Sequence, residues 1–256
     1  MLPAVRPATL LVTAAVVTLI LTALSVWVRV TALDPVSDAL FGQHPPTGFA
    51  VAYRLFDADG EGNVPAWFSV LLLAMTALFS LGVSSLLRDR GAPLRRYWTG
   101  LAAVFLYLSV DELAMVHEEL MPRLEQVVEA EGALTFSWVV VAAPLVAVFV
   151  LVYARFLWRL PRDTAALLVL AGALYVGGAL GLEVVGGMVL DEVKVVNLAY
   201  VLVTSAEEFL EMAGAALALY TVARYARSLM QDADGGLIPA NGSVTSISGE
   251  TKPPAA

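Results

Sequence analysis

Long runs of hydrophobic residues alternate along the chain with short polar segments, and each run is long enough for a membrane-spanning helix. About 20 apolar residues in helical conformation span the hydrocarbon core of a bilayer. The runs predict spans at about residues 9–28, 66–87, 97–120, 136–158, 164–187 and 197–223. The predicted fold is therefore all-α, a polytopic integral membrane protein built as a six-transmembrane-helix bundle.

The first run has the alternative interpretation of a signal peptide. The apolar core of a signal peptide is shorter, roughly 7–15 residues, and leads to a small-residue cleavage site. The run at 9–28 is longer, and Trp27 and Arg29 at its end are typical of residues that anchor a helix at a membrane surface. We expect it to be retained as the first span.

The polar connections differ in charge, which predicts the orientation. Arginines gather in the segment 88–96, around the turn between the fourth and fifth spans, and after the sixth span, whereas the other connections are mainly acidic. Because cytoplasmic loops collect Lys and Arg, both termini are predicted to lie in the cytoplasm, with the protein in an inner (plasma) membrane. Residues 1–229 form the predicted membrane domain, and the Gly/Ser/Pro-rich residues 230–256 form a predicted disordered tail.

Composition supports this class and excludes others. Hydrophobic residues make up 59% of the 256 residues, and the mean hydropathy is +0.78. The formal charge of −8 argues against nucleic acid as a partner. The chain has no cysteine, which excludes disulfides and thiolate metal sites, and it has only two histidines, His44 and His117.

The third predicted span carries an unusual amount of charge in "LYLSVDELAMVHEEL", residues 106–120. In a continuous helix each residue advances about 100°, so Asp111 and Glu118, seven positions apart, differ by only about 20°. Glu112 lies on a neighbouring stripe, and His117 lies on the flank of Glu118. We expect one acidic face and one apolar face on this span.

The fifth and sixth spans add further acids. Glu207, Glu208 and Glu211 fall within an arc of about 100° on the sixth span, and Glu183 lies near the end of the fifth. Given the predicted orientation and a rise of about 1.5 Å per residue, these acids lie between the bilayer midplane and the outer surface.

Small residues accompany these acids. Gly177 and Gly181 on the fifth span have the small-xxx-small spacing that lets two helices approach closely. Thr204, Ala215 and Ala218 share the acidic arc of the sixth span. We expect another helix to pack closely against this face.

Carboxylates at this depth need compensation. One ionised acid at mid-bilayer costs at least about 2.5 kcal/mol on insertion scales. Protonation with shared hydrogen bonds, a neutralising cation, or a water-filled vestibule would each supply the compensation. Glu112, Glu118 and Glu119, and Glu183 at a helix end, have the alternative interpretation of solvated interfacial residues. The candidate metal ligands are Asp111, His117, Glu118, Glu183, Glu208 and Glu211, with Glu112 and Glu207 as alternative ligands or supporting groups.

Carboxylates with one imidazole suit a divalent cation such as Fe, Mn, Mg, Ca or Zn. Di-iron sites in helix bundles use Glu-x-x-His pairs, which this chain lacks. The segment "DADGEGN" (57–63) imitates the first half of an EF-hand loop. The twelfth position is Phe68, where a bidentate glutamate would be required, so we predict a polar turn before a helix.

Three functional hypotheses remain at this point. The leading one is a membrane protein with a metal site in the outer half of the bundle, acting as a metal-dependent enzyme. The alternative is an ion- or proton-coupled transporter built as a 3+3 inverted repeat, since spans three and six both carry acids. The third is a structural membrane module whose protonated acids bridge helices.

Three blocks of the sequence, "VPAWFS" (64–69), "LSVDELAMVHEEL" (108–120) and "EEFLEMAGAALALY" (207–220), resemble blocks in a group of uncharacterised bacterial polytopic membrane proteins. The resemblance covers most of the chain except the tail. It implies a shared site and no particular activity, substrate or oligomeric state.

Overall fold

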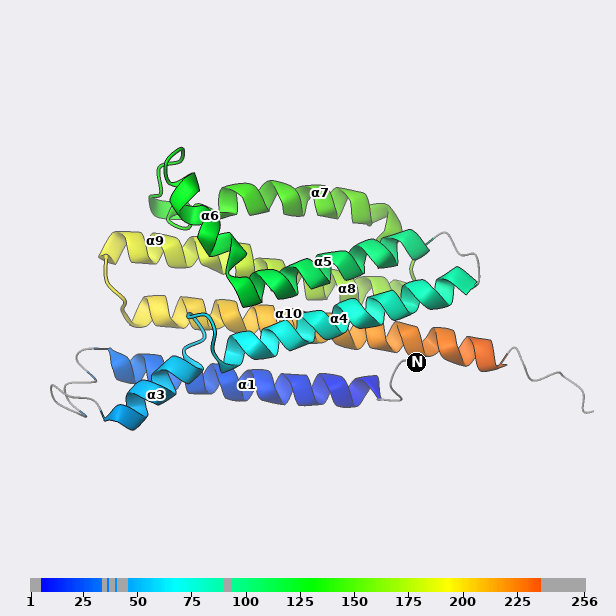
Figure 1. Ribbon diagram of the computed structural model, residues 1–256, viewed down its shortest axis with the longest axis horizontal. Helices are drawn as coiled ribbons and strands as arrows, with labels where there is room; N and C mark the ends of the chain where they lie inside the picture. The colour runs from blue at the N-terminus through cyan, green and yellow to red at the C-terminus, as the bar shows by residue number, and fades with distance from the viewer. Residues whose placement is uncertain (1–5, 34–35, 37–39, 41–45, 90–93, 236–256) are drawn as a thin grey trace, which may run out of the picture.

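The computed structural model describes residues 6–33, 36, 40, 46–89 and 94–235, and over these residues the chain is helical with no β-strand (Figure 1). The helices are α1 (Pro7–Ala32), α3 (Thr47–Phe56), α4 (Val64–Asp89), α5 (Arg95–Ala114), α6 (Val116–Leu124), α7 (Val139–Leu157), α8 (Arg162–Val176), α9 (Glu183–Val193) and α10 (Leu198–Gly235). A 3₁₀ turn (Gly132–Leu134) precedes α7, and a π-helical segment (Gly177–Leu182) joins α8 to α9. The all-α class predicted from the sequence is confirmed.

Several helices are long and apolar enough to cross a membrane. Four segments of the described chain qualify, namely α1, α4, α7 and the continuous run from α8 to α9, and the bent pair α5–α6 makes a fifth if it counts as one span. The helix α10 does not qualify, because it carries three glutamates within five residues and arginines at 224 and 227. The structure is thus that of a helical protein compatible with multiple membrane passes.

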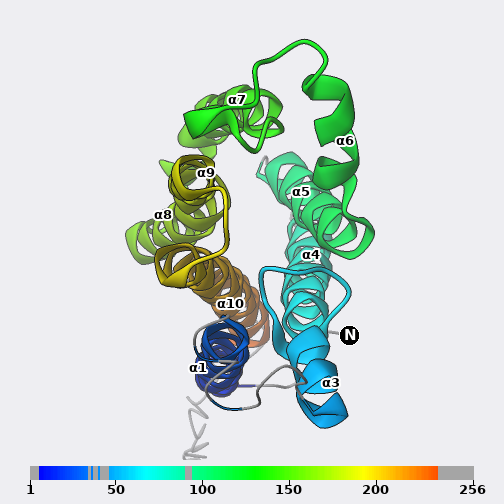
Figure 2. The same cartoon turned by 90° about the vertical axis from the view of Figure 1, so that its left-hand side faces the viewer.

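The long helix α10 organises the bundle by packing along α1, α4 and α8, while α5 packs on α4. The end view in Figure 2 shows α7 at one edge of the molecule and α1 and α3 at the opposite edge. Only Val139, Tyr153 and Phe156 of α7 are buried, and Leu151 of the same helix is 76% exposed. The outward face of α7 is therefore apolar and uncovered by protein.

Aromatic side chains of the hydrophobic core pack together where α5 begins. Trp98 is fully buried, and its ring stacks on Tyr225 of α10 with centroids 5.1 Å apart. Phe156 of α7 meets the Trp98 ring edge-on at 5.4 Å. These aromatic contacts join α5, α7 and α10 at the end of the bundle opposite the acidic residues.

The prediction of one continuous helix over 97–120 is wrong. Met115 adopts a left-handed conformation (φ 54°, ψ 39°), and the axes of α5 and α6 differ by 73° across it. The single acidic face expected for Asp111 and Glu118 therefore does not exist, because the two residues lie on different helix axes.

The close helix contact predicted at Gly177 and Gly181 lies instead at Gly178. A Cβ atom at Gly178 would come within 2.8 Å of the carbonyl oxygen of Glu207 on α10, whereas a Cβ at Gly177 or Gly181 would meet nothing within 4 Å. Gly178 continues the face of α8 that carries Ala171 and Tyr175, whose backbones lie against Gly214 of α10, whereas Gly177 and Gly181 lie off that face. The expectation that another helix packs closely against the acidic face of α10 is still met, through Gly178.

The sequence predicts Arg29 as an anchor at the membrane surface, but in the structure its side chain is inside the protein. Its side chain is buried, forms ion pairs with Asp57 (3.2 Å) and Asp59 (2.7 Å), and donates a hydrogen bond to the Thr204 hydroxyl (2.6 Å). Trp27, by contrast, is 56% exposed. Arg29 therefore ties the segment before α4 to both α1 and α10.

The predicted tail begins as helix, since α10 continues to Gly235. Residues 236–256 of that tail lie outside the described residues, as does His44.

The close approach at Gly178 generates a stability prediction. We expect Gly178→Ala to lower the melting temperature of the detergent-solubilised protein, with a cost of about 1–3 kcal/mol, because the new methyl group meets backbone atoms that cannot move aside. Gly177→Ala is the matched control and should leave the melting temperature unchanged or slightly raised. Equal melting temperatures for the two variants would contradict the packing described.

Candidate metal centre

The break at Met115 turns the start of α6 back toward α5 and brings His117 onto Asp111. Asp111 accepts two hydrogen bonds from the same residue, from the backbone N–H of His117 at 3.1 Å and from its Nδ1 at 3.0 Å. Asp111 thus caps the new helix and fixes the imidazole orientation. Since Nδ1 faces Asp111, Nε2 is the ring nitrogen left to bind another group.

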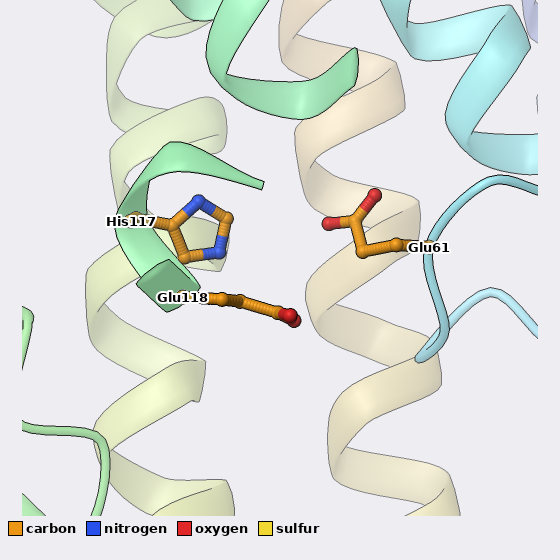
Figure 3. Close-up of side chains that lie close together, drawn as sticks. All are labelled: Glu61, His117 and Glu118. Atoms are coloured by element: carbon orange, nitrogen blue, oxygen red, sulfur yellow. The ribbon is translucent and has the colours of Figure 1, made fainter. Parts of the chain in front are cut away.

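Three side chains converge beside this pair. Glu61, His117 and Glu118 each offer one ligand atom, and these atoms lie within 4.8 Å of one another. Figure 3 shows Glu61 reaching across from the segment before α4, while His117 and Glu118 extend from α6. We call these three residues the His–Glu–Glu cluster.

Glu61 supplies a direct sign of an unmet interaction. Its Oε2 atom is shielded from solvent and has no hydrogen-bond partner among the described residues. A buried carboxylate oxygen without a partner is costly, and a cation is one way to satisfy it.

The turn that carries Glu61 is fixed at both ends. Before it, Asp57 and Asp59 pair with Arg29. After it, Asn63 caps α4, since its side-chain oxygen accepts a hydrogen bond from the Ala66 N–H at 2.9 Å. The predicted polar turn before a helix is what the structure contains, and its role is to hold Glu61 over α6.

Trp138 links His117 to the fifth predicted span. The indole ring lies 4.9 Å from the imidazole ring between centroids, and its Nε1 donates a hydrogen bond to Glu183 at 2.7 Å. Glu183 in turn lies beside Glu207 on α10, close enough for a hydrogen bond between their carboxyl groups. Neither carboxyl group belongs to the His–Glu–Glu cluster.

The remaining predicted ligands form a second group, which we call the inner carboxylate cluster: Glu112, Glu183, Glu207, Glu208 and Glu211. Glu112 interacts electrostatically with Glu61 and His117, so it connects the two clusters. Glu208 interacts electrostatically with Glu112, and Glu211 interacts electrostatically with both Glu112 and Glu208.

Four of the eight residues predicted as ligands or supporting groups thus surround one point or connect to it. His117 and Glu118 point toward Glu61, Asp111 holds His117 from behind, and Glu112 lies beside them. The other four lie outside this group, on α9 and α10: Glu183, Glu207, Glu208 and Glu211.

Sequence reasoning missed Glu61 as a candidate. The signal was present, because "DADGEGN" places three acids in five residues directly before an apolar run. The EF-hand pattern fails at its twelfth position, Phe68, so the segment predicts no metal site by itself. Glu61 becomes a candidate only in combination with ligands from a distant helix, and sequence spacing does not reveal that combination.

Burial and neighbouring charge change the acidity of Glu61. Loss of solvent and the nearby charge of Glu118 raise the pKa of the Glu61 carboxyl from 4.5 to about 7, against a smaller opposing effect of His117. The proton that this pKa retains is the one that a metal ion would displace.

The fold and this geometry define a class, an all-helical protein with several apolar helices and a His–Glu–Glu group able to hold a metal ion. The chain belongs to the family described as "Domain of unknown function (DUF8692)", whose model matches residues 9–225. The match runs from α1 into α10 and includes every residue of both clusters. No curated protein and no solved structure matches the chain.

The raised pKa of Glu61 predicts how the metal-free protein responds to pH. Between pH 4.5 and about 7 the folded state keeps a proton on Glu61 that the unfolded chain releases, so the melting temperature should fall as the pH rises through this window. Glu61→Gln should make this fall shallower, as measured by thermal unfolding in the presence of a chelator. The exposed neighbour Glu119 provides the control, since Glu119→Gln should keep the wild-type slope. Identical slopes in the wild type and Glu61→Gln would contradict the prediction.

Proposed function

We propose that this protein is an integral membrane protein that binds a divalent metal ion through Glu61, His117 and Glu118 and uses it in a metal-dependent reaction at the outer face of the membrane. The chain passes six times, with α5–α6 as a broken third span and α10 as the sixth. Both termini lie in the cytoplasm, because the arginine-rich connections fall on that side.

The observation that carries the proposal is the convergence of three ligand atoms within 4.8 Å, one of whose side chains has a buried, unpartnered oxygen. The arrangement behind His117 adds to it. Histidines that bind metals commonly donate their second ring N–H to a carboxylate, which fixes the tautomer and the ring orientation. Asp111 occupies that position at 3.0 Å from Nδ1.

The types of the three ligands limit which metal ions suit the site. Mg²⁺ and Ca²⁺ prefer oxygen ligands alone, whereas one imidazole with two carboxylates suits Mn²⁺, Fe²⁺ or Zn²⁺. Two carboxylates and a neutral imidazole also balance the charge of a divalent ion, which removes the cost of burying the acids unpaired.

Three protein ligands favour a reactive role over a structural one. Structural zinc sites are closed by four protein ligands, while catalytic sites keep a position for water or substrate. A metal ion held by three side chains here would supply Lewis acidity and an acidified bound water. The residues of the chain hold and orient: Asp111 positions His117, and the segment held by Arg29 and Asn63 positions Glu61.

Ion transport is the second candidate, and the inner carboxylate cluster favours it. Glu112, Glu208 and Glu211 continue from the metal centre toward the middle of α10, as polar residues along a conduction path would. The inverted repeat behind this candidate receives no support, since α5–α6 is broken at Met115 while α10 is continuous.

Metal content tests the proposal directly. We expect detergent-purified wild type to hold one divalent metal ion per chain by elemental analysis, and Glu61→Gln and Glu118→Gln to lose it. Asp111→Asn should weaken affinity by about 10- to 100-fold, because the imidazole loses its orienting partner. Glu119→Gln should retain the metal.

The double variant Glu208→Gln/Glu211→Gln completes this experiment. Retention of the metal in the double variant agrees with binding at the His–Glu–Glu cluster. Loss there, with retention in Glu61→Gln, would move the metal to the inner carboxylate cluster and overturn the proposal, as would absence of metal from wild type after reloading.

Sidedness separates an enzyme from a transporter. The chain has no cysteine, so Glu208→Cys creates a single labelling site in sealed vesicles of known orientation. For an outward-facing enzyme we expect a membrane-impermeant maleimide to react from the outer side only. Reaction from both sides would contradict this expectation and favour alternating access.

A further inference from the structure

A small pocket opens beside the metal centre between the start of α4 and the end of α5. Its volume is about 160 Å³. Its walls come from the turn before α4, from the first turns of α4 and from the end of α5, and the lining residues are Gly62, Asn63, Ala66, Trp67, Val70, Glu112 and Leu113. Glu112 is the only charged residue among them.

Glu61, His117 and Glu118 do not line the pocket, but two of its lining residues lie close to them. Gly62 follows Glu61 directly in the chain, and Glu112 interacts electrostatically with Glu61, His117 and Asp111. A group bound against Glu112 would therefore lie next to the side chains proposed to hold the metal.

The other side of the pocket is apolar and open. Trp67 is 60% exposed and Leu113 is 65% exposed. In a helix that crosses a membrane, exposed apolar side chains of this size face the acyl chains rather than water. With α4 and α5 spanning the membrane as proposed above, this apolar side of the pocket faces lipid.

We infer that this pocket admits an amphiphile from the bilayer, with a metal-coordinating polar head group against Glu112 and a single apolar chain running out between Trp67 and Leu113. The inference deepens the proposed function and rests on it, since it names the class of substrate that reaches the metal. The two ends of the pocket match the two ends of such a molecule. A metal held by the cluster would attract lone pairs of the head group, and the Trp67 ring and Leu113 side chain would cover the first part of the apolar chain. The volume fits a head group and the start of a chain, and the rest of the chain remains in lipid.

The test uses two probes that share one head group. Acetohydroxamate and dodecyl hydroxamate both chelate metal ions, and only the second carries a long chain. Both are titrated into Co²⁺-loaded full-length protein in lipid nanodiscs, where the visible spectrum of Co²⁺ reports ligand binding. We expect Trp67→Ala to weaken the binding of dodecyl hydroxamate by about tenfold. The binding of acetohydroxamate and the Co²⁺ occupancy should stay unchanged.

A matched control removes the effect of simple partitioning into lipid. Trp27 is similarly exposed, at 56%, but belongs to α1 and does not line the pocket. Trp27→Ala should leave the affinity of both probes at the wild-type value.

The outcomes distinguish the two levels of the hypothesis. If Co²⁺ binds at the cluster but Trp67→Ala and Trp27→Ala affect the dodecyl probe equally, the pocket is not the route and this inference is overturned, while the metal site stands. If Co²⁺ occupancy does not depend on Glu61 and Glu118, the proposed function fails, and this inference fails with it.

Discussion

The end of the bundle that carries the His–Glu–Glu cluster depends on one buried guanidinium. Arg29 extends from α1, pairs with Asp57 and Asp59 and bonds to Thr204 of α10, so a single side chain joins three parts of the chain. A buried charge is tolerated only when it is paired and hydrogen-bonded, and Arg29 meets both conditions. Through this junction the segment before α4 acquires a fixed position, and Glu61 acquires a fixed direction over α6.

The carboxylates of the bundle differ in the partners that offset the free-energy cost of their burial. Asp57 and Asp59 have Arg29, and Asp111 has the imidazole and backbone N–H of His117. Glu183 has the Trp138 indole. Glu61 retains a buried oxygen that has no hydrogen-bond partner within the described part of the chain. Among these acids of the described chain, the carboxylate with an unpartnered oxygen is therefore the one at the point where three candidate ligands converge.

The sequence was sufficient for the all-α class and for the helices near most of the predicted spans, because long apolar runs have one stable solution in a bilayer. It was also sufficient for His117 and Glu118 as neighbours. The errors came where the backbone leaves the α-helix. Met115 is an ordinary helix former in sequence, so its left-handed conformation and the 73° bend carry no local signal. Glu61 was missed because its partners, His117 and Glu118, are more than 50 residues away in the chain. Sequence spacing does not show which distant residues come close in the fold.

The π-helical segment at Gly177–Leu182 has a consequence for comparing members of the family. A π-helical turn holds about one residue more than an α-helical turn, so its loss corresponds to a one-residue deletion. Because the wider turn absorbs the extra residue, such a deletion would leave α9 close to its present rotation relative to α8, with Glu183 still facing Trp138 and Glu207. A single-position gap at 177–182 in an alignment of related chains would therefore mark a relative that has lost the π-helical turn but can keep this acidic contact.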